Sequence, residues 1–82
     1  YAITTNVSGT DPLVSPFTIN NTDIIQATGN TVFTTATNFT ISGTGTFNTN
    51  GFTIDVNGVI GGTGNLTKSG SNTLTLTGAN TY

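Results

Sequence analysis

Charged side chains are rare in this sequence, and they set narrow limits on the chemistry it can perform. Of its 82 residues only four are charged, namely Asp11, Asp23, Asp55 and Lys68. Paired carboxylates can act as general acid and base on a glycosidic bond. However, the sequence has no histidine that could activate a hydroxyl nucleophile. We therefore expect no enzymatic activity, and we interpret the three acids as turn, loop and outward-facing strand residues.

No segment has the residue types and spacing of a cofactor or metal site. Cysteine, histidine and methionine are absent, which removes the usual ligands of zinc, haem and iron–sulfur clusters. The segment Gly61–Leu66 is similar to a calcium-binding nonapeptide repeat, but Leu66 stands where that repeat has Asp. A glycine-rich phosphate loop fails as well, because Thr67 occupies the position of its third glycine. We expect neither cofactor nor metal.

The charge balance also narrows the choice of partners. A net charge of −2 with a single lysine cannot neutralise many phosphates, so we expect no nucleic-acid partner. No apolar run approaches the ~20 residues of a membrane-spanning helix, and we expect no membrane insertion. A polar surface with so few charges is typical of a secreted or cell-surface protein.

The composition favours strands. Threonine accounts for 21 residues, and asparagine and glycine for 11 each, with Ile and Val also frequent. Threonine and the other β-branched residues prefer strands, whereas the strong helix formers are nearly missing, with one Lys, one Gln and no Glu or Arg. The length allows a single small domain, which we assign to residues 1–82.

Apolar and polar residues alternate in several short segments, as expected for strands with one buried face. The triplet Phe-Thr-Ile occurs at Phe17–Ile19 and Phe39–Ile41, and it opens the longer segment Phe52–Val56. Leu74–Thr77 follows the same pattern. The unequal spacing of the triplets predicts repeats of variable length. We predict that the following side chains point inward: Phe17, Ile19, Val32, Phe39, Ile41, Phe47, Phe52, Ile54, Val56, Ile60, Leu66, Leu74 and Leu76.

Turn signals separate these segments. They are Ser8-Gly9, Asp11-Pro12, Gly29-Asn30, Asn50-Gly51, Asn57-Gly58, Gly61-Gly62 and Ser69-Gly70. Two all-β architectures fit: an antiparallel sheet with a hairpin turn at Asn50-Gly51, or a β-solenoid of stacked coils. The recurring triplet, the very short strands and the abundant Asn and Thr, which can form ladders between coils, favour the solenoid. We predict about four short coils.

The last third of the chain carries a more specific pattern. Residues 58–82 read GVIGGTGNLTKSGSNTLTLTGANTY. This segment resembles the autotransporter-associated β-strand repeat of Gram-negative passenger proteins. The matching parts are Gly61–Gly64, Leu66–Lys68, Ser69–Asn72, Thr73–Leu76 and Gly78–Tyr82. The resemblance implies a right-handed parallel β-helix, exported to the extracellular space or the bacterial cell surface, without catalytic residues.

The ends of such a solenoid are its most notable feature. An uncapped coil exposes unpaired backbone groups, which natural proteins protect with charge, proline or a cap. The sequence shows no cap and no charged side chain close to either terminus, so we expect copies to stack end to end into a surface filament or fibre. The expected assembly interface comprises Tyr1, Ala2, Ile3, Leu74, Leu76 and Tyr82.

Two other binding functions remain to be weighed against this structural role. The chain could be a fragment of an adhesin passenger whose Asn and Thr faces, with Phe or Tyr, bind host or surface glycans. Ice binding would need one Thr-x-Thr pair on each equal coil. The pairs beginning at Thr35, Thr44, Thr73 and Thr75 are spaced too irregularly for that.

Overall fold

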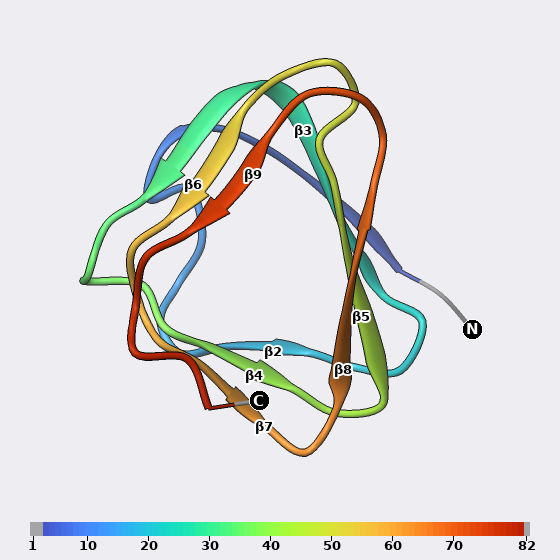
Figure 1. Ribbon diagram of the computed structural model, residues 1–82, viewed down its shortest axis with the longest axis vertical. Coiled ribbons are helices and arrows are strands. Elements are labelled where there is room, and N and C mark those ends of the chain that lie inside the picture. The colour runs from blue at the N-terminus through green and yellow to red at the C-terminus, as the bar shows by residue number, and fades with distance from the viewer. Residues whose placement is uncertain (1–2, 82) are drawn as a thin grey trace.

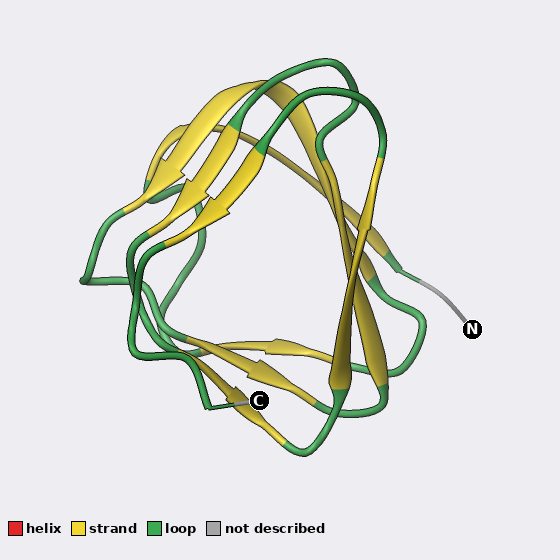
Figure 2. Cartoon of the chain, in the orientation of Figure 1, coloured by secondary structure: helices red, strands yellow, loops and turns green. Residues whose placement is uncertain are grey.

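A computed structural model describes residues 3–81. In this part of the chain all regular elements are strands and there is no helix, as Figure 2 shows, so the all-β prediction is confirmed. The strands are β1 (Thr4–Thr10), β2 (Phe17–Ile19), β3 (Ile24–Phe33), β4 (Phe39–Ile41), β5 (Thr44–Asn48), β6 (Ile54–Val56), β7 (Ile60–Gly62), β8 (Asn65–Ser69) and β9 (Leu74–Leu76).

The strands stack into a three-sided solenoid (Figure 1). In that view the chain runs counter-clockwise while it advances from the blue coil at the back to the red coil at the front, which makes the solenoid right-handed. Every strand pairing is parallel. The predicted β-helix is therefore confirmed, and the antiparallel alternative is wrong.

Two sheets make up the three sides. A six-stranded sheet contains β8, β5, β3, β6 and β9 in that order, with β1 paired to β3, and it covers two sides. The third side is a sheet of three strands in the order β2, β4, β7. Residues that pair on neighbouring coils are 20 to 23 positions apart in the sequence. Thr4 and Ile24 show the shortest separation, and Thr31 and Ile54 the longest. The chain thus completes between three and four turns, close to the predicted four coils.

Two long strands each run across two sides of the solenoid. The first half of β3 pairs with β5 and its second half with β6, while β1 pairs along β3 with a register shift between Val7 and Gly9. The turn signals Ser8-Gly9 and Gly29-Asn30 therefore lie inside strands, where they mark bends. Gly9 has a φ of 78°, which a residue with a side chain adopts only at a cost.

The pair Asn50-Gly51 does form a tight turn, but that turn joins two sides of a coil. Both residues have positive φ, at 51° and 85°, and the amide of Phe52 donates to the carbonyl of Thr49 at 2.8 Å. The strand that follows, β6, pairs with β3 and β9 and not with β5. The same local geometry that closes a two-residue hairpin here turns a corner between stacked coils.

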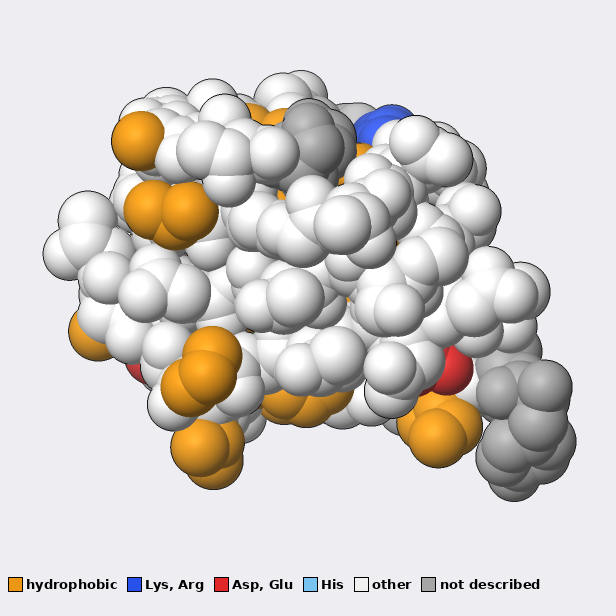
Figure 3. Space-filling model, turned by 90° about the horizontal axis from the view of Figure 1, so that it is seen from below, with side chains coloured by type: hydrophobic (Ala, Val, Ile, Leu, Met, Phe, Trp, Pro, Cys, Tyr) orange, Lys and Arg blue, Asp and Glu red, His pale blue; other side chains and the backbone are white. Residues whose placement is uncertain are grey.

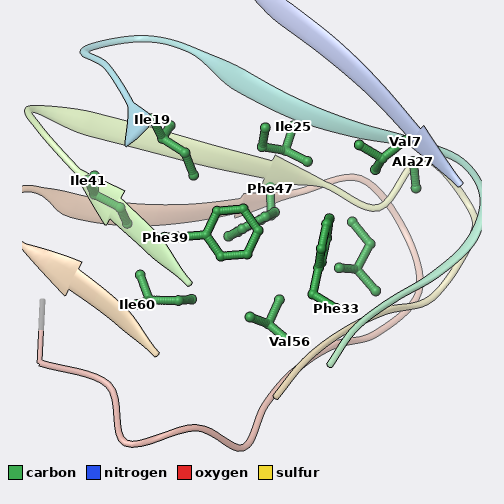
Figure 4. Packing of buried hydrophobic residues seen from close by; sticks show 11 residues of the cluster. Val7, Ile19, Ile25, Ala27, Phe33, Phe39, Ile41, Phe47, Val56 and Ile60 are labelled. Carbon is green, nitrogen blue, oxygen red and sulfur yellow. The ribbon is translucent and has the colours of Figure 1, made fainter. Parts of the chain in front are cut away.

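Phenylalanines from all three sides meet in the core, which Figure 4 shows from close by. Phe39 lies at the centre: its ring packs edge-on against Phe33 at 4.9 Å, Phe47 at 5.5 Å and Phe17 at 6.2 Å between centroids. Such edge-to-face pairs add to the stabilisation from burial. The buried hydrophobic residues are Val7, Ile19, Ile25, Ala27, Phe33, Phe39, Ile41, Phe47, Ile54, Val56 and Ile60.

Most of the inward-facing predictions hold. Seven of the predicted residues are buried (Ile19, Phe39, Ile41, Phe47, Ile54, Val56 and Ile60), and five are partly buried against the core (Phe17, Phe52, Leu66, Leu74 and Leu76). The prediction for Val32 was wrong. In β3 its neighbours Thr31 and Phe33 face the core, with 1% and 0% of their surface exposed, and Val32 therefore lies on the outer face.

Candidate assembly surfaces at the two ends of the solenoid

Within residues 3–81, five of the nine strands pair with other strands along one edge only. These are β1 and β2 in the first coil, and β7, β8 and β9 at the other end. We call the first coil, residues 3–23 with β1 and β2, the N-terminal end face, and β7, β8 and β9 the C-terminal end face. Backbone groups along a free strand edge can pair with a strand from another chain. Both end faces are therefore the candidate functional surfaces of the fold.

The N-terminal end face carries several exposed hydrophobic side chains. Leu13 and Phe17 pack against the core and remain partly exposed, whereas Ile3 is 53% and Val14 82% exposed. Figure 3 shows the molecule from the side: hydrophobic atoms lie along the lower end and in a second group at the upper left, with mostly polar atoms between the two ends. Exposed hydrophobic side chains that gather at one place are typical of an interaction surface.

The C-terminal end face ends in three leucines. Leu66 pairs in the register with Gly45, Leu74 with Ile54, and Leu76 with Val56. Gly45, Ile54 and Val56 are buried by the coil that follows them, whereas the leucines, over which residues 3–81 place no further coil, are half-buried. Residues that pair from coil to coil form columns along the solenoid, and the three leucines are the last members of columns that line the core. A further coil would complete their burial.

One part of this face is already covered. The amide of Thr81 donates to the carbonyl of Ile60 at 2.9 Å, and the amide of Ile60 donates to the side-chain oxygen of Asn80 at 2.8 Å. These bonds occupy the first residue of β7. The free edge of the six-stranded sheet, formed by β8 and β9, is the larger open part.

Lys68 lies on β8 opposite the buried Phe47, at a register position that faces the core. Its ammonium does not stay there, because it donates to the carbonyl of Gly70 at 2.6 Å, in the turn that follows β8. A lysine can cover apolar surface with its aliphatic stem while its charged group remains in water. The C-terminal end face thus carries a positive charge at one corner.

Asp11 and Asp23 lie at the opposite end. The carboxylate of Asp11 accepts hydrogen bonds from the Thr34 hydroxyl at 2.6 Å, the Thr34 amide at 2.8 Å and the Thr37 hydroxyl at 2.8 Å. Because these bonds favour the charged form, with the Thr34 hydroxyl the largest cause, the pKa of Asp11 lies below its ordinary value. Asp23 accepts from the amides of Ile3 and Asn20 at 3.0 and 3.2 Å.

The sequence has no charged side chain close to either terminus, yet the fold brings charges to both end faces. Asp11 and Asp23 lie in or next to the first coil and Lys68 lies in the last, so the two end faces carry charges of opposite sign. The third acid, Asp55, lies in β6, one strand before β9. The sequence did not reveal this arrangement, because the position of a residue along the chain does not show on which coil it falls.

Asparagine side chains hold successive coils together at the corners. The side-chain oxygen of Asn21 accepts from the amide of Thr44 at 3.1 Å, that of Asn30 from Thr53 at 3.0 Å, and that of Asn38 from Val59 at 3.0 Å. Each of these amides lies 21 to 23 residues further along, in the next coil. These three asparagines thus replace strand hydrogen bonds where the chain turns.

The predicted interface residues fall at both ends. Ile3 precedes β1 on the N-terminal end face, and Leu74 and Leu76 lie in β9 on the C-terminal end face. Tyr1, Ala2 and Tyr82 lie outside the described residues. Val14 and Lys68 also belong to these faces, although they were not among the predicted interface residues. Val14 sits between two prolines in a segment without alternation, and nothing in that segment shows which way its side chain points.

Residues 3–81 contain no pocket, no cluster of three or more potential metal ligands, and no helix of the length and hydropathy needed to cross a membrane. Comparison of the chain with known protein families, curated proteins and solved structures found no match.

Proposed function

We propose that the chain is an extracellular structural protein of the bacterial cell surface, whose copies stack end to end into a filament. The observation that carries this proposal is the presence of free strand edges at both ends of one solenoid. Parallel strands that extend in the same direction allow the last coil of one copy to be followed by the first coil of another. Such a head-to-tail contact does not close on itself and would continue into a fibre.

The nature of the two end faces supports the proposal. Leu66, Leu74 and Leu76 are half-buried members of core columns, and a further coil would remove their remaining surface from water. Each Å² of apolar surface that becomes buried contributes ~25 cal/mol. The opposite charges of the two faces would favour head-to-tail contact and disfavour contact between two like ends.

The cell-surface location rests on the resemblance of residues 58–82 to the autotransporter-associated repeat. In this segment Leu66-Thr67-Lys68 lies in β8 and Leu74-Thr75-Leu76 is β9. Between them Gly70 has a φ of 82°, in agreement with the turn that the pattern implies. The segment therefore occupies the solenoid as a structural repeat would, which supports a passenger-like role without catalytic residues.

Electron microscopy and analytical ultracentrifugation of the purified protein over a range of concentrations test this proposal. We expect filaments or a series of oligomers whose size increases with concentration. The variant Leu76→Asp places a charge on the open column of β9 and should abolish assembly. A matched control, Thr40→Asp, adds the same charge to the exposed outer face of the middle strand β4 and should assemble normally. Compact monomers at high concentration of the unmodified protein would overturn the proposal.

A second candidate function, glycan binding by an adhesin passenger, is favoured by one outer row of amides. Asn6, Gln26 and Asn48 lie in one column on successive strands, and Asn48 donates to Gln26 at 3.4 Å. Such a row offers hydrogen-bond donors and acceptors to sugar hydroxyls. A glycan array with the unmodified protein and with Gln26→Ala tests this function. Binding to a defined glycan that the variant loses would support it.

A further inference from the structure

We propose that the junction between copies has a defined register, in which β1 of one copy pairs with β8 and β9 of another. In this register Thr4 lies opposite Thr67, and Thr10 lies opposite Thr75. The inference rests on the proposed end-to-end assembly and specifies which residues meet. The partner is therefore a second copy of this chain.

The columns of the six-stranded sheet predict these pairs. Thr4 pairs with Ile24, Ile24 with Thr46, and Thr46 with Thr67, so that one column runs through all four rungs of the first side. A second column on the next side runs through Thr10, Val32, Asp55 and Thr75 in the same way. If a second copy continues the solenoid, the first residue of each column in that copy lies next to the last residue of the same column in the copy before it.

The spacing along the strands allows both pairs to form together. On β3 the partners of Thr4 and Thr10 are Ile24 and Val32, which are eight positions apart, since 32 − 24 = 8. On the C-terminal end face Thr67 and Thr75 are also eight positions apart, since 75 − 67 = 8. Because of the register shift between Val7 and Gly9, the segment from Thr4 to Thr10 already pairs with a stretch of β3 whose ends are eight positions apart. The opposite edge of β1 would pair with a stretch of the same length on the C-terminal end face of the neighbouring copy.

The inner face of the junction fits this register as well. Gly9 would lie over Leu74, because the column that starts at Gly9 continues through Thr31 and Ile54 to Leu74. A Cβ built on Gly9 has no atom within 4 Å, so this end of the column is open. The missing side chain leaves room for the leucine, whose exposed surface would become buried between the two copies.

The lysine of the last coil also has a place in this register. Thr5 would lie over Lys68, because Thr5 pairs with Ile25, Ile25 with Phe47, and Phe47 with Lys68. The aliphatic stem of Lys68 would become covered by β1 of the next copy, while its ammonium, which donates to the carbonyl of Gly70, would stay at the edge of the junction.

Disulfide cross-linking tests this register, because the natural sequence contains no cysteine. Neighbouring strands lie ~4.8 Å apart, within the range of Cα separations that a disulfide spans. In the double variant Thr4→Cys with Thr67→Cys, mild oxidation should give a ladder of covalent oligomers that reductant dissolves. Within one copy β3 and β5 separate the two positions, so the bond can form only between copies. Thr10→Cys with Thr75→Cys tests the second pair independently.

A matched control shifts one partner by two residues on the same face of β8. In Thr4→Cys with Ser69→Cys the two Cα atoms would lie roughly 7–8 Å apart across the junction, beyond the reach of an unstrained disulfide. We expect at least tenfold slower cross-linking in this control. If the unmodified protein assembles but the control cross-links as fast as both predicted pairs, the register is wrong and the proposed function stands. If the unmodified protein does not assemble at any concentration, both proposals fail.

Discussion

The carboxylate of Asp11 accepts a hydrogen bond from the amide of Thr34, which lies 23 residues further along the chain and one coil further along the solenoid, at 2.8 Å. Asp11 has a φ of 47°, and its own amide donates to the carbonyl of Val32. The residue thus joins the first coil to the second through both its backbone and its side chain. It stabilises the coil that the N-terminal end face presents.

Stability should depend on pH through Asp11. Because its pKa is lower in the folded state than its ordinary value of 3.8, the stabilisation is fully present above that value and is lost as the pH falls through the lower folded pKa. Asp11→Asn should lower the melting temperature at neutral pH and make it less dependent on pH below the ordinary pKa of 3.8. Thermal unfolding followed by circular dichroism at several pH values measures both effects. An unchanged pH profile in the variant would contradict this role.

Phe39 should be the most sensitive position in the core. Its ring contacts Phe17, Phe33 and Phe47, and only 2% of its surface is exposed. Replacement of a buried phenylalanine by alanine costs ~3–5 kcal/mol, so Phe39→Ala should unfold at a much lower denaturant concentration. Phe17→Ala, on the partly buried end of the same column, is the matched comparison and should cost less. An equal or larger loss for Phe17→Ala would show that the centre of the core lies elsewhere.

Gly58 should resist substitution because two coils approach each other closely there. A Cβ on Gly58 would overlap the carbonyl oxygen of Thr37 in the preceding coil, and one on Gly78 would overlap the carbonyl oxygen of Gly58. Gly58→Ala should therefore destabilise the fold by about 1–3 kcal/mol, the usual cost of an overpacked site. Gly61→Ala is the control, since its Cβ would meet only the hydroxyl of Thr81 at 3.3 Å. Equal denaturation midpoints for the two variants would rule out the close approach.

Assembly should depend on the charge at position 68. Lys68→Glu would present a negative charge to the end face that carries Asp11 and Asp23, whereas Lys68→Gln removes the charge at similar length. We expect assembly to weaken from the unmodified protein to the glutamine variant and further to the glutamate variant. The differences should shrink as salt screens the charges. Light scattering against protein and salt concentration measures this order. A glutamate variant that assembles normally at low salt would exclude a contribution of charge to the junction.

The sequence was sufficient for the fold class because the alternation repeats with the same face inward. Phe17, Phe39 and Ile60, which begin the three strands of the third side, form one column. The length of the repeat was harder to see. The segment Phe52–Val56 has the same sequence as the first two Phe-Thr-Ile triplets at its start, but it lies on a different side of the solenoid. Its Ile54 pairs with Thr31 and Leu74, in the other sheet. Identical triplets thus occur on different sides of the solenoid.

The errors in β3 have a physical origin in its composition. Its buried positions alternate without a break through the bend at Gly29 and Asn30, and they are Ile25, Ala27, Thr31 and Phe33. The pairs Ile24-Ile25 and Val32-Phe33 each place a hydrophobic residue on both faces, and a threonine takes one inward position, so hydrophobicity alone does not show which face is buried. The end faces depend on which residues share a coil, and this follows only when the length of each turn is known.

Each coil of the solenoid is bonded only to the coils directly before and after it, because paired residues lie 20 to 23 positions apart throughout. A pulling force applied to the two termini would therefore peel the molecule from its ends one turn at a time. Each turn would release about 70 Å of contour length, given the reach of ~3.3–3.6 Å per residue in an extended chain. A stretched filament of such units would yield in small, equal steps, and it would dissipate mechanical load before the whole structure failed.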